Sequence, residues 1–182
     1  MWNQLLFAIS ALCGIAILVL GLLDFTRKDF IFWPPPEKGS WQDWTFITLF
    51  RGMLYPLIAL SVLHLANNQP ALMSVFMGGI LLLIGFGLAF ASTSNLGWKN
   101  AFGDKQGLVT EGWFAYSRNP VYVVTWIGMI GWAILVQSTQ VWFILFLWAV
   151  IYVFAIFLEE RWLTKVYGQE FLNYKRKVRR FI

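Results

Sequence analysis

Residues 121–158 read VYVVTWIGMIGWAILVQSTQVWFILFLWAVIYVFAIFL and contain no Asp, Glu, Lys or Arg. The polar run Gln137-Ser138-Thr139-Gln140 divides this stretch into two apolar segments, residues 121–136 and 141–158. A helix that crosses the hydrocarbon core of a bilayer needs about 20 mostly apolar residues, with a lower limit near 17. The stretch therefore predicts a transmembrane helical hairpin closed by a short polar turn.

Three more apolar segments precede this hairpin, at residues 2–25, 44–65 and 71–91. The first has no basic region before it and is long enough to span, so we interpret it as a retained helix rather than a signal peptide. The expected fold is all-α: a polytopic membrane protein of about five transmembrane helices in one integral membrane domain, residues 1–182. Residues 92–120 and 159–182 are expected to be cytoplasmic, the second with an amphipathic helix.

The composition excludes an ordinary soluble domain. The chain is 59% hydrophobic and 13% charged, whereas soluble domains carry about 25% charged residues. The net charge of +5 falls in loops and at the C-terminus, which indicates a membrane partner rather than nucleic acid. The single cysteine, Cys13, permits no disulfide within the chain and no thiolate metal site, and we predict no metal.

The basic residues indicate the orientation of the chain. With five spans, one face carries both long loops and the C-terminus, and the other face carries no Lys or Arg in its short loops. The basic residues of the two long loops are Arg27, Lys28, Lys38, Lys99, Lys105 and Arg118. The positive-inside rule then predicts the N-terminus outside and the C-terminus in the cytoplasm.

A polar segment enters the fourth span at Ser117-Arg118-Asn119-Pro120-Val121-Tyr122. Pro120 suits the first turn of a helix, where its missing N–H costs nothing. The free N–H groups of that turn, together with Arg118, are able to hold an anion such as a carboxylate. The alternative is an interfacial arginine beside an ordinary helix start.

The fifth span ends in Glu159-Glu160 and is expected to continue as a charged helix. Adjacent residues on a helix point about 100° apart, so one carboxylate can face the bundle while the other meets solvent or a loop. An inward carboxylate would pair with Arg118 or bind a cofactor's ammonium or hydroxyl groups. A solvated helix end is the alternative.

Other features have two interpretations each. Gly85 and Gly87 allow close approach of a ligand or of another helix. Arg51, inside the second span, either extends to the interface or lines a polar cavity. The Trp-Pro-Pro-Pro run at residues 33–36 predicts a stiff loop on the interface. Phe171, Tyr174 and Val178 form an apolar helix face, which either lies on anionic lipid or roofs a site.

Together these segments resemble a family. The stretch GLVTEGWFAYSRNPVY at residues 107–122, a helical hairpin, Glu159-Glu160 and the Tyr167-Gly168 tail resemble the isoprenylcysteine carboxyl methyltransferases, which are related to the phospholipid N-methyltransferases. The resemblance covers the chain from about Gly85 to the end. Two departures are Asn119, where many relatives have His, and Val124, where many have Gly.

The resemblance implies an S-adenosylmethionine-dependent membrane methyltransferase whose cofactor lies between the inner ends of the last spans and the C-terminal helix. It implies these cofactor-binding residues: Gly85, Gly87, Tyr116, Arg118, Asn119, Pro120, Tyr122, Glu159 and Glu160. The catalytic candidates are Arg118, Glu159, Glu160 and Arg51, since a cation would orient a carboxylate nucleophile and a carboxylate would accept a proton from an amine.

The expected substrate is a lipid-like or prenylated small molecule that enters from the bilayer. Carboxyl O-methylation of an isoprenylcysteine is the first interpretation, and N-methylation of a phospholipid is the alternative; a small thiol and a quinone or terpenoid also stay open. Two other classes remain: an NADPH-dependent enzyme like the membrane sterol reductases, and a non-catalytic membrane scaffold.

Overall fold

The structure of the protein is a computed structural model that describes residues 2–27, 29–101 and 106–181. Lys28 and Lys105, used above for the orientation, lie outside these residues. The described residues form helices and no strand. The helices are α1 (Trp2–Thr26), α2 (Trp41–Asn67), α3 (Leu72–Leu96), α4 (Trp98–Ala101), the 3-10 helix η1 (Gly112–Ala115), α5 (Pro120–Val136), α6 (Thr139–Tyr167) and α7 (Gln169–Lys177).

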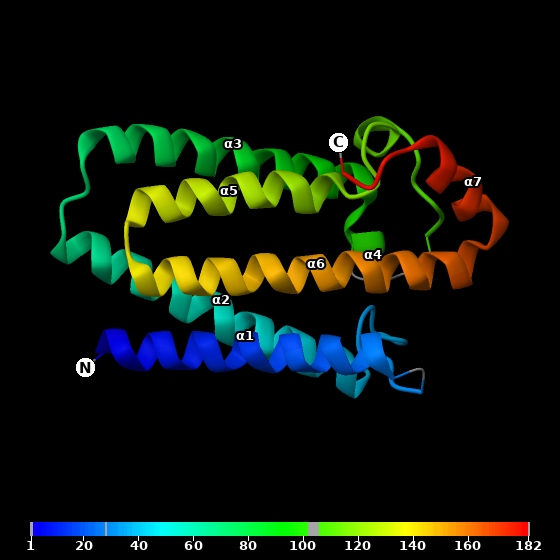
Figure 1. Ribbon diagram of the computed structural model, residues 1–182, viewed down its shortest axis with the longest axis horizontal. Helices are drawn as coiled ribbons and strands as arrows, with labels where there is room; N and C mark the ends of the chain where they lie inside the picture. Colours follow the sequence, from blue (N-terminus) through cyan, green and yellow to red (C-terminus); the bar gives the residue numbers. More distant parts are fainter. Residues whose placement is uncertain (1, 28, 102–105, 182) are drawn as a thin grey trace.

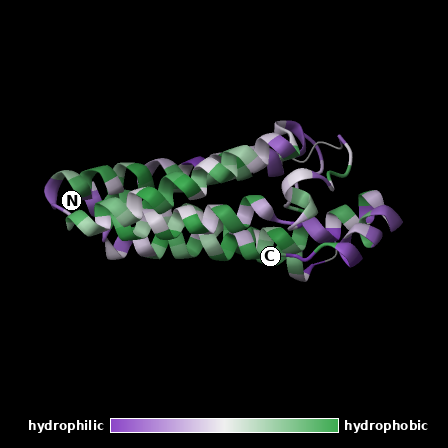
Figure 2. Ribbon diagram, turned by 90° about the horizontal axis from the view of Figure 1, so that it is seen from above, coloured by the Kyte–Doolittle hydropathy of each residue, from purple (hydrophilic) through white to green (hydrophobic). Residues whose placement is uncertain are grey.

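Five of these helices form an elongated bundle along the long axis of the molecule (Figure 1). Four of them, α1, α2, α3 and α6, are long and apolar enough to cross a membrane, and α5 is a shorter apolar helix. Figure 2 shows hydrophobic residues along the helices and hydrophilic residues gathered at the ends, above all at the end near the C-terminus. The prediction of an all-α polytopic membrane protein is confirmed.

The last spanning helix is longer than its apolar segment. α6 runs on from the apolar residues through Glu159 and Glu160 to Tyr167, as the sequence predicted, and it ends at Gly168. Gly168 has φ 51°, a left-handed conformation that glycine adopts readily, and its N–H closes the helix by donating to the Thr164 carbonyl. The charged last turns of α6 therefore belong to the same rigid rod as the membrane span.

Glycines bring α3 and α5 into backbone contact. A Cβ built on Gly85 would lie 2.1 Å from the Gly128 nitrogen, and one on Gly78 would lie 2.8 Å from the Gly131 carbonyl oxygen. Small residues are the usual means of close helix approach in membranes. α3 packs along α5 more extensively than any other pair of helices, while α1 packs on α2 and α6.

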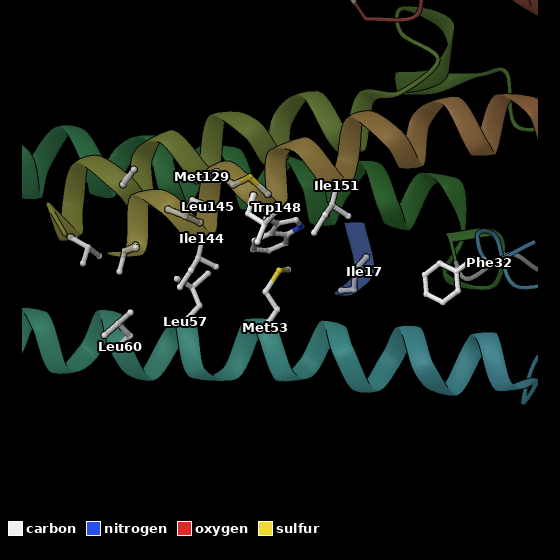
Figure 3. Close-up of a cluster of buried hydrophobic side chains, with 14 residues drawn as sticks. Ile17, Phe32, Met53, Leu57, Leu60, Met129, Ile144, Leu145, Trp148 and Ile151 are labelled. Carbon is white, nitrogen blue, oxygen red and sulfur yellow. The ribbon is translucent and has the colours of Figure 1, made fainter. Parts of the chain in front are cut away.

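The apolar core lies between α2, α5 and α6 (Figure 3). Met53, Leu57 and Leu60 point from α2 toward Ile144 and Trp148 of α6, and all five are buried. Phe32, from the loop between α1 and α2, is also buried in this cluster. The core therefore anchors that loop to the bundle at the end where α7 lies, which we call the α7 end.

Candidate functional site

A cavity of about 320 Å³ lies at the α7 end of the bundle. Ligand pockets commonly enclose about 300–1,000 Å³. Its walls come from the α1–α2 loop, α2, the end of α3, the segment before α5, α5, α6 and α7. Its lining includes Trp33, Phe46, Phe50, Leu96, Asn100, Val109, Arg118, Asn119, Pro120, Tyr122, Tyr152, Glu159, Glu160, Tyr167, Phe171 and Tyr174.

Glu159 lies in the aromatic part of this cavity. One carboxylate oxygen, Oε1, accepts hydrogen bonds from the Tyr122 hydroxyl at 2.5 Å and from the Trp33 indole N–H at 2.9 Å. The Tyr152 ring meets the Tyr122 ring edge to face at 4.6 Å. Among the described residues, no basic side chain pairs with Glu159 and no donor reaches Oε2. The carboxylate thus has two neutral protein partners and one oxygen without a protein donor.

Glu160, the next residue, is held by three cations. Arg118 donates to Oε1 from Nε and Nη2 at 3.2 and 2.8 Å, and Arg180 donates to Oε1 and Oε2 at 3.0 and 2.9 Å. The Lys175 ammonium lies 3.6 Å from Oε2. The ion pair between Glu160 and Arg118 is one of the interpretations that the sequence left open for an inward glutamate. One negative charge among three positive charges leaves this cluster net positive, and Arg118 and Glu160 are its members that line the cavity.

Arg118 also fastens the C-terminal segment. Its Nη1 donates to the carbonyls of Lys175 and Val178, both at 2.9 Å, and its backbone N–H donates to the Arg179 carbonyl. The Asn119 amide donates to the Arg180 carbonyl at 3.1 Å. Residues 118–119, directly before α5, therefore hold residues 175–180 at the end of α7 and beyond it. In each of these hydrogen bonds, residue 118 or 119 is the donor.

α7 closes the cavity with its apolar face. Phe171 and Tyr174 are buried, whereas Val178 follows the last residue of α7 and is half-buried. The Tyr174 hydroxyl donates to the Phe114 carbonyl at 2.6 Å, and burial of the phenol raises the pKa of Tyr174 to about 12. Hydrogen bonds to Glu160 raise the pKa of the Arg180 guanidinium. At neutral pH the Tyr174 phenol is therefore neutral and the Arg180 guanidinium is cationic.

The Trp-Pro-Pro-Pro loop packs into the protein, and its place on the membrane interface stays a prediction. Trp33 reaches the cavity, and Pro34 and Pro35 are buried. The reason is Asp24, which is 0% exposed at the end of α1 and whose Oδ2 accepts the N–H groups of Phe32 and Trp33 at 2.6 and 2.8 Å.

Three residues that were not predicted from the sequence belong to the site or support it: Trp33 lines the cavity, while Asp24 and Arg180 bind the lining residues Trp33 and Glu160. The one available signal was Asp24 itself, an acidic residue that closes a long apolar run, since ionisable residues at such positions are costly and often have a function. Nothing local connects Trp33 to Glu159, because 126 positions separate them. Arg180 counted only toward the positive charge at the C-terminus.

The structure brings together six of the residues expected from the sequence, all lining the cavity: Arg118, Asn119, Pro120, Tyr122, Glu159 and Glu160. The other four are not among its lining residues. Gly85 contacts α5, Gly87 is exposed, Tyr116 is 82% exposed, and Arg51 is exposed on α2. A cofactor or catalytic role for these four stays a prediction from the resemblance.

The spans and the charged cavity at their end define the class of protein: a polytopic membrane protein with a cavity at one end of its bundle. The model of the phospholipid methyltransferase family matches residues 73–170, more than half of the chain, and the chain belongs to this family. It is therefore a membrane methyltransferase. Searches of curated proteins and of solved structures found no match.

Proposed function

We propose that the protein transfers a methyl group from S-adenosylmethionine to a lipid-like small molecule, and that the cavity at the α7 end is the site. The observation that carries the proposal is the Glu159 carboxylate, which lies among Trp33, Tyr122 and Tyr152 with neutral hydrogen-bond partners only. A carboxylate in an aromatic enclosure favours a cation through charge and through the ring faces.

The cavity fits such a cofactor by its charges. The cofactor supplies an electrophilic methyl group on a sulfonium, next to an amino acid end that bears an ammonium and a carboxylate. The net positive cluster of Arg118, Arg180 and Lys175 around Glu160 suits an anionic group. Glu159 and the aromatic rings suit a positive one. The residues proposed to hold the cofactor are the six sequence-derived residues that line the cavity.

The same charges favour an amine over a carboxylate as the acceptor. A carboxylate acceptor would need a cation of its own, but the carboxylate of the cofactor would already take the positive cluster around Glu160, in which the Arg118 side chain donates four hydrogen bonds to protein acceptors. Arg51, the other cation considered for that role, does not line the cavity. An amine must lose a proton before it attacks, and Glu159 has an oxygen without a protein donor that would accept it. N-methylation of a phospholipid-like amine is therefore the finer proposal.

The protein's own contribution would be positioning and exclusion of water. Transfer from a sulfonium is an in-line displacement, in which alignment of the two reactants lowers the barrier. Phe46, Phe50, Leu96 and Val121 give the cavity an apolar side that suits an acyl or prenyl chain, while α7 covers it. We further propose that the α7 end faces the cytoplasm, as the distribution of Lys and Arg indicates.

The test is a radiolabelled methyl-transfer assay on purified protein in lipid vesicles. Phosphatidylethanolamine and a synthetic prenylcysteine are supplied in parallel, and S-adenosylhomocysteine binding is measured by calorimetry. We expect label in the amine lipid, loss of transfer in Glu159→Gln, and normal transfer in the matched control Glu111→Gln, an exposed residue whose side chain makes no cap hydrogen bond.

Three outcomes would contradict these statements. Label in prenylcysteine alone would refute the amine and keep the methyltransferase. Unchanged S-adenosylhomocysteine binding in a variant with both Glu159→Gln and Asn119→Ala would refute the site. Binding of NADPH in place of S-adenosylhomocysteine would favour the reductase. Binding of neither molecule would favour the non-catalytic scaffold.

A further inference from the structure

Asp24 organises the loop between α1 and α2 from a fully buried position. One carboxylate oxygen accepts two consecutive backbone N–H groups, those of Phe32 and Trp33. The other oxygen and the Asp24 carbonyl accept from the Arg161 guanidinium of α6. A buried carboxylate with every oxygen engaged holds its partners firmly, since breaking such bonds leaves a charge unpaired. The loop is thereby tied to the same helix that carries Glu159.

Trp33 carries this constraint into the cavity. Its ring lies on Phe46 with centroids 4.2 Å apart, and its indole N–H donates to Glu159 Oε1 at 2.9 Å. Tyr122 donates to the same oxygen. Because both donors use Oε1, the carboxylate cannot rotate without losing two hydrogen bonds. Oε2, for which the described residues provide no donor, is the oxygen left for a bound molecule.

We propose that Trp33 and Asp24 are positioning residues for Glu159: the Trp33 indole fixes one oxygen of the carboxylate so that the other serves the reactants, and Asp24 holds Trp33 in place. Both residues lie before the region that matches the family model, residues 73–170. The inference rests on the proposed function, since it assigns to Glu159 a part in methyl transfer.

The experiment compares Trp33→Phe and Asp24→Asn with the wild type in the methyl-transfer assay. Trp33→Phe keeps a ring on Phe46 and removes the donor together with the five-membered ring of the indole, so it carries the test if Asp24→Asn fails to fold. The matched control is Asp29→Asn, in the same loop, where the side chain is exposed. Calorimetry with S-adenosylhomocysteine and the Tm in detergent report whether each variant is folded.

For both variants we expect kcat to fall roughly tenfold, while KM for S-adenosylmethionine stays within about twofold. Adding Trp33→Phe to Glu159→Ala should cause no further loss, since the group that Trp33 positions is then absent. If Trp33 and Asp24 have only a structural role, the variants should have a lower Tm, and kcat should not fall selectively while KM stays constant. Kinetics equal to those of Asp29→Asn, or losses that multiply with Glu159→Ala, would overturn the inference.

The inference stays testable if the wild type transfers no methyl group to any substrate, which would refute the proposed function. The thermal unfolding of Trp33→Phe, Glu159→Ala and the double variant then decides. If the Tm of the double variant falls by less than the sum of the falls in the two single variants, Trp33 is coupled to Glu159. Additive changes in Tm would overturn it.

Discussion

Replacing Arg118 with Ala should release the C-terminal segment from the bundle. The side chains of Arg118 and Glu160 are each 7% exposed, so this ion pair is shielded from water. The substitution removes four hydrogen bonds: two to Glu160, one to the Lys175 carbonyl and one to the Val178 carbonyl. Both carbonyls lie in the segment that closes the cavity.

The size of the effect follows from what remains. Removing one partner of a buried ion pair costs about 3–5 kcal/mol. Arg180 and Lys175 still neutralise Glu160 in the variant, so the lower figure of about 3 kcal/mol applies. A free-energy change of about 1.4 kcal/mol is a factor of ten, so the open population of the segment should rise by roughly a hundredfold. Arg118→Lys should lie between, because lysine keeps the charge and loses the planar fork.

Hydrogen exchange followed by mass spectrometry measures this opening in the amides of α7. We expect the exchange of those amides to accelerate by about two orders of magnitude in Arg118→Ala, with the amides in the centre of α6 unchanged. Arg176→Ala is the matched control, since Arg176 is exposed and, within the part of the chain that the structure describes, its side chain bonds only to Asn173. Equal exchange in Arg118→Ala and Arg176→Ala would refute the reasoning that Arg118 fastens α7.

Two further predictions concern packing and pH. Gly85→Ala should lower the Tm in detergent by roughly 5 °C, since overpacking costs about 1–3 kcal/mol; Gly87→Ala, where nothing lies within 4 Å of the added Cβ, should not, and equal losses would contradict the packing role of Gly85. Tyr174 has a pKa raised to about 12 in the folded protein, so it should contribute stability that is complete below about pH 10 and is lost as the pH rises toward 12. The Tm difference between wild type and Tyr174→Phe should shrink over that interval, and a constant difference would show that Tyr174 does not titrate with folding.

Much of the fold could be predicted because the thickness of the bilayer sets the length of each spanning helix. Apolar segments of spanning length and the polar turn at residues 137–140 are local features, and most of the boundaries that they predict lie within three residues of the observed ones. The exceptions are α3, which ends five residues later at Leu96, and α6, which ends nine residues later at Tyr167. The separate directions of Glu159 and Glu160 followed from helix geometry alone. Each of these inferences used only residues close together in the chain.

The rest of the site depended on contacts that sequence separation conceals. Trp33 meets Glu159 across 126 positions, and Asp24 meets Arg161 across 137. An acidic residue at the end of an apolar run is also typical of an ordinary solvated helix end, so the signal that Asp24 gave was ambiguous. Gly85 was ambiguous for a different reason: its meaning depends on Gly128 of α5, which the two-residue Gly-x-Gly pattern does not include.

The two glutamates require different experimental interpretations, although they are neighbours on one helix. Glu160 binds Arg118, Arg180 and Lys175, so a change at Glu160 or Arg118 disturbs the closure of α7 whether or not either group meets a reactant. Loss of activity at these two positions therefore does not assign them a catalytic role. Glu159 has only neutral partners, and its isosteric change to Gln keeps an acceptor for Trp33 and Tyr122. A loss of methyl transfer in Glu159→Gln with α7 still closed is thus the result that would assign a catalytic role to Glu159 and exclude a structural explanation.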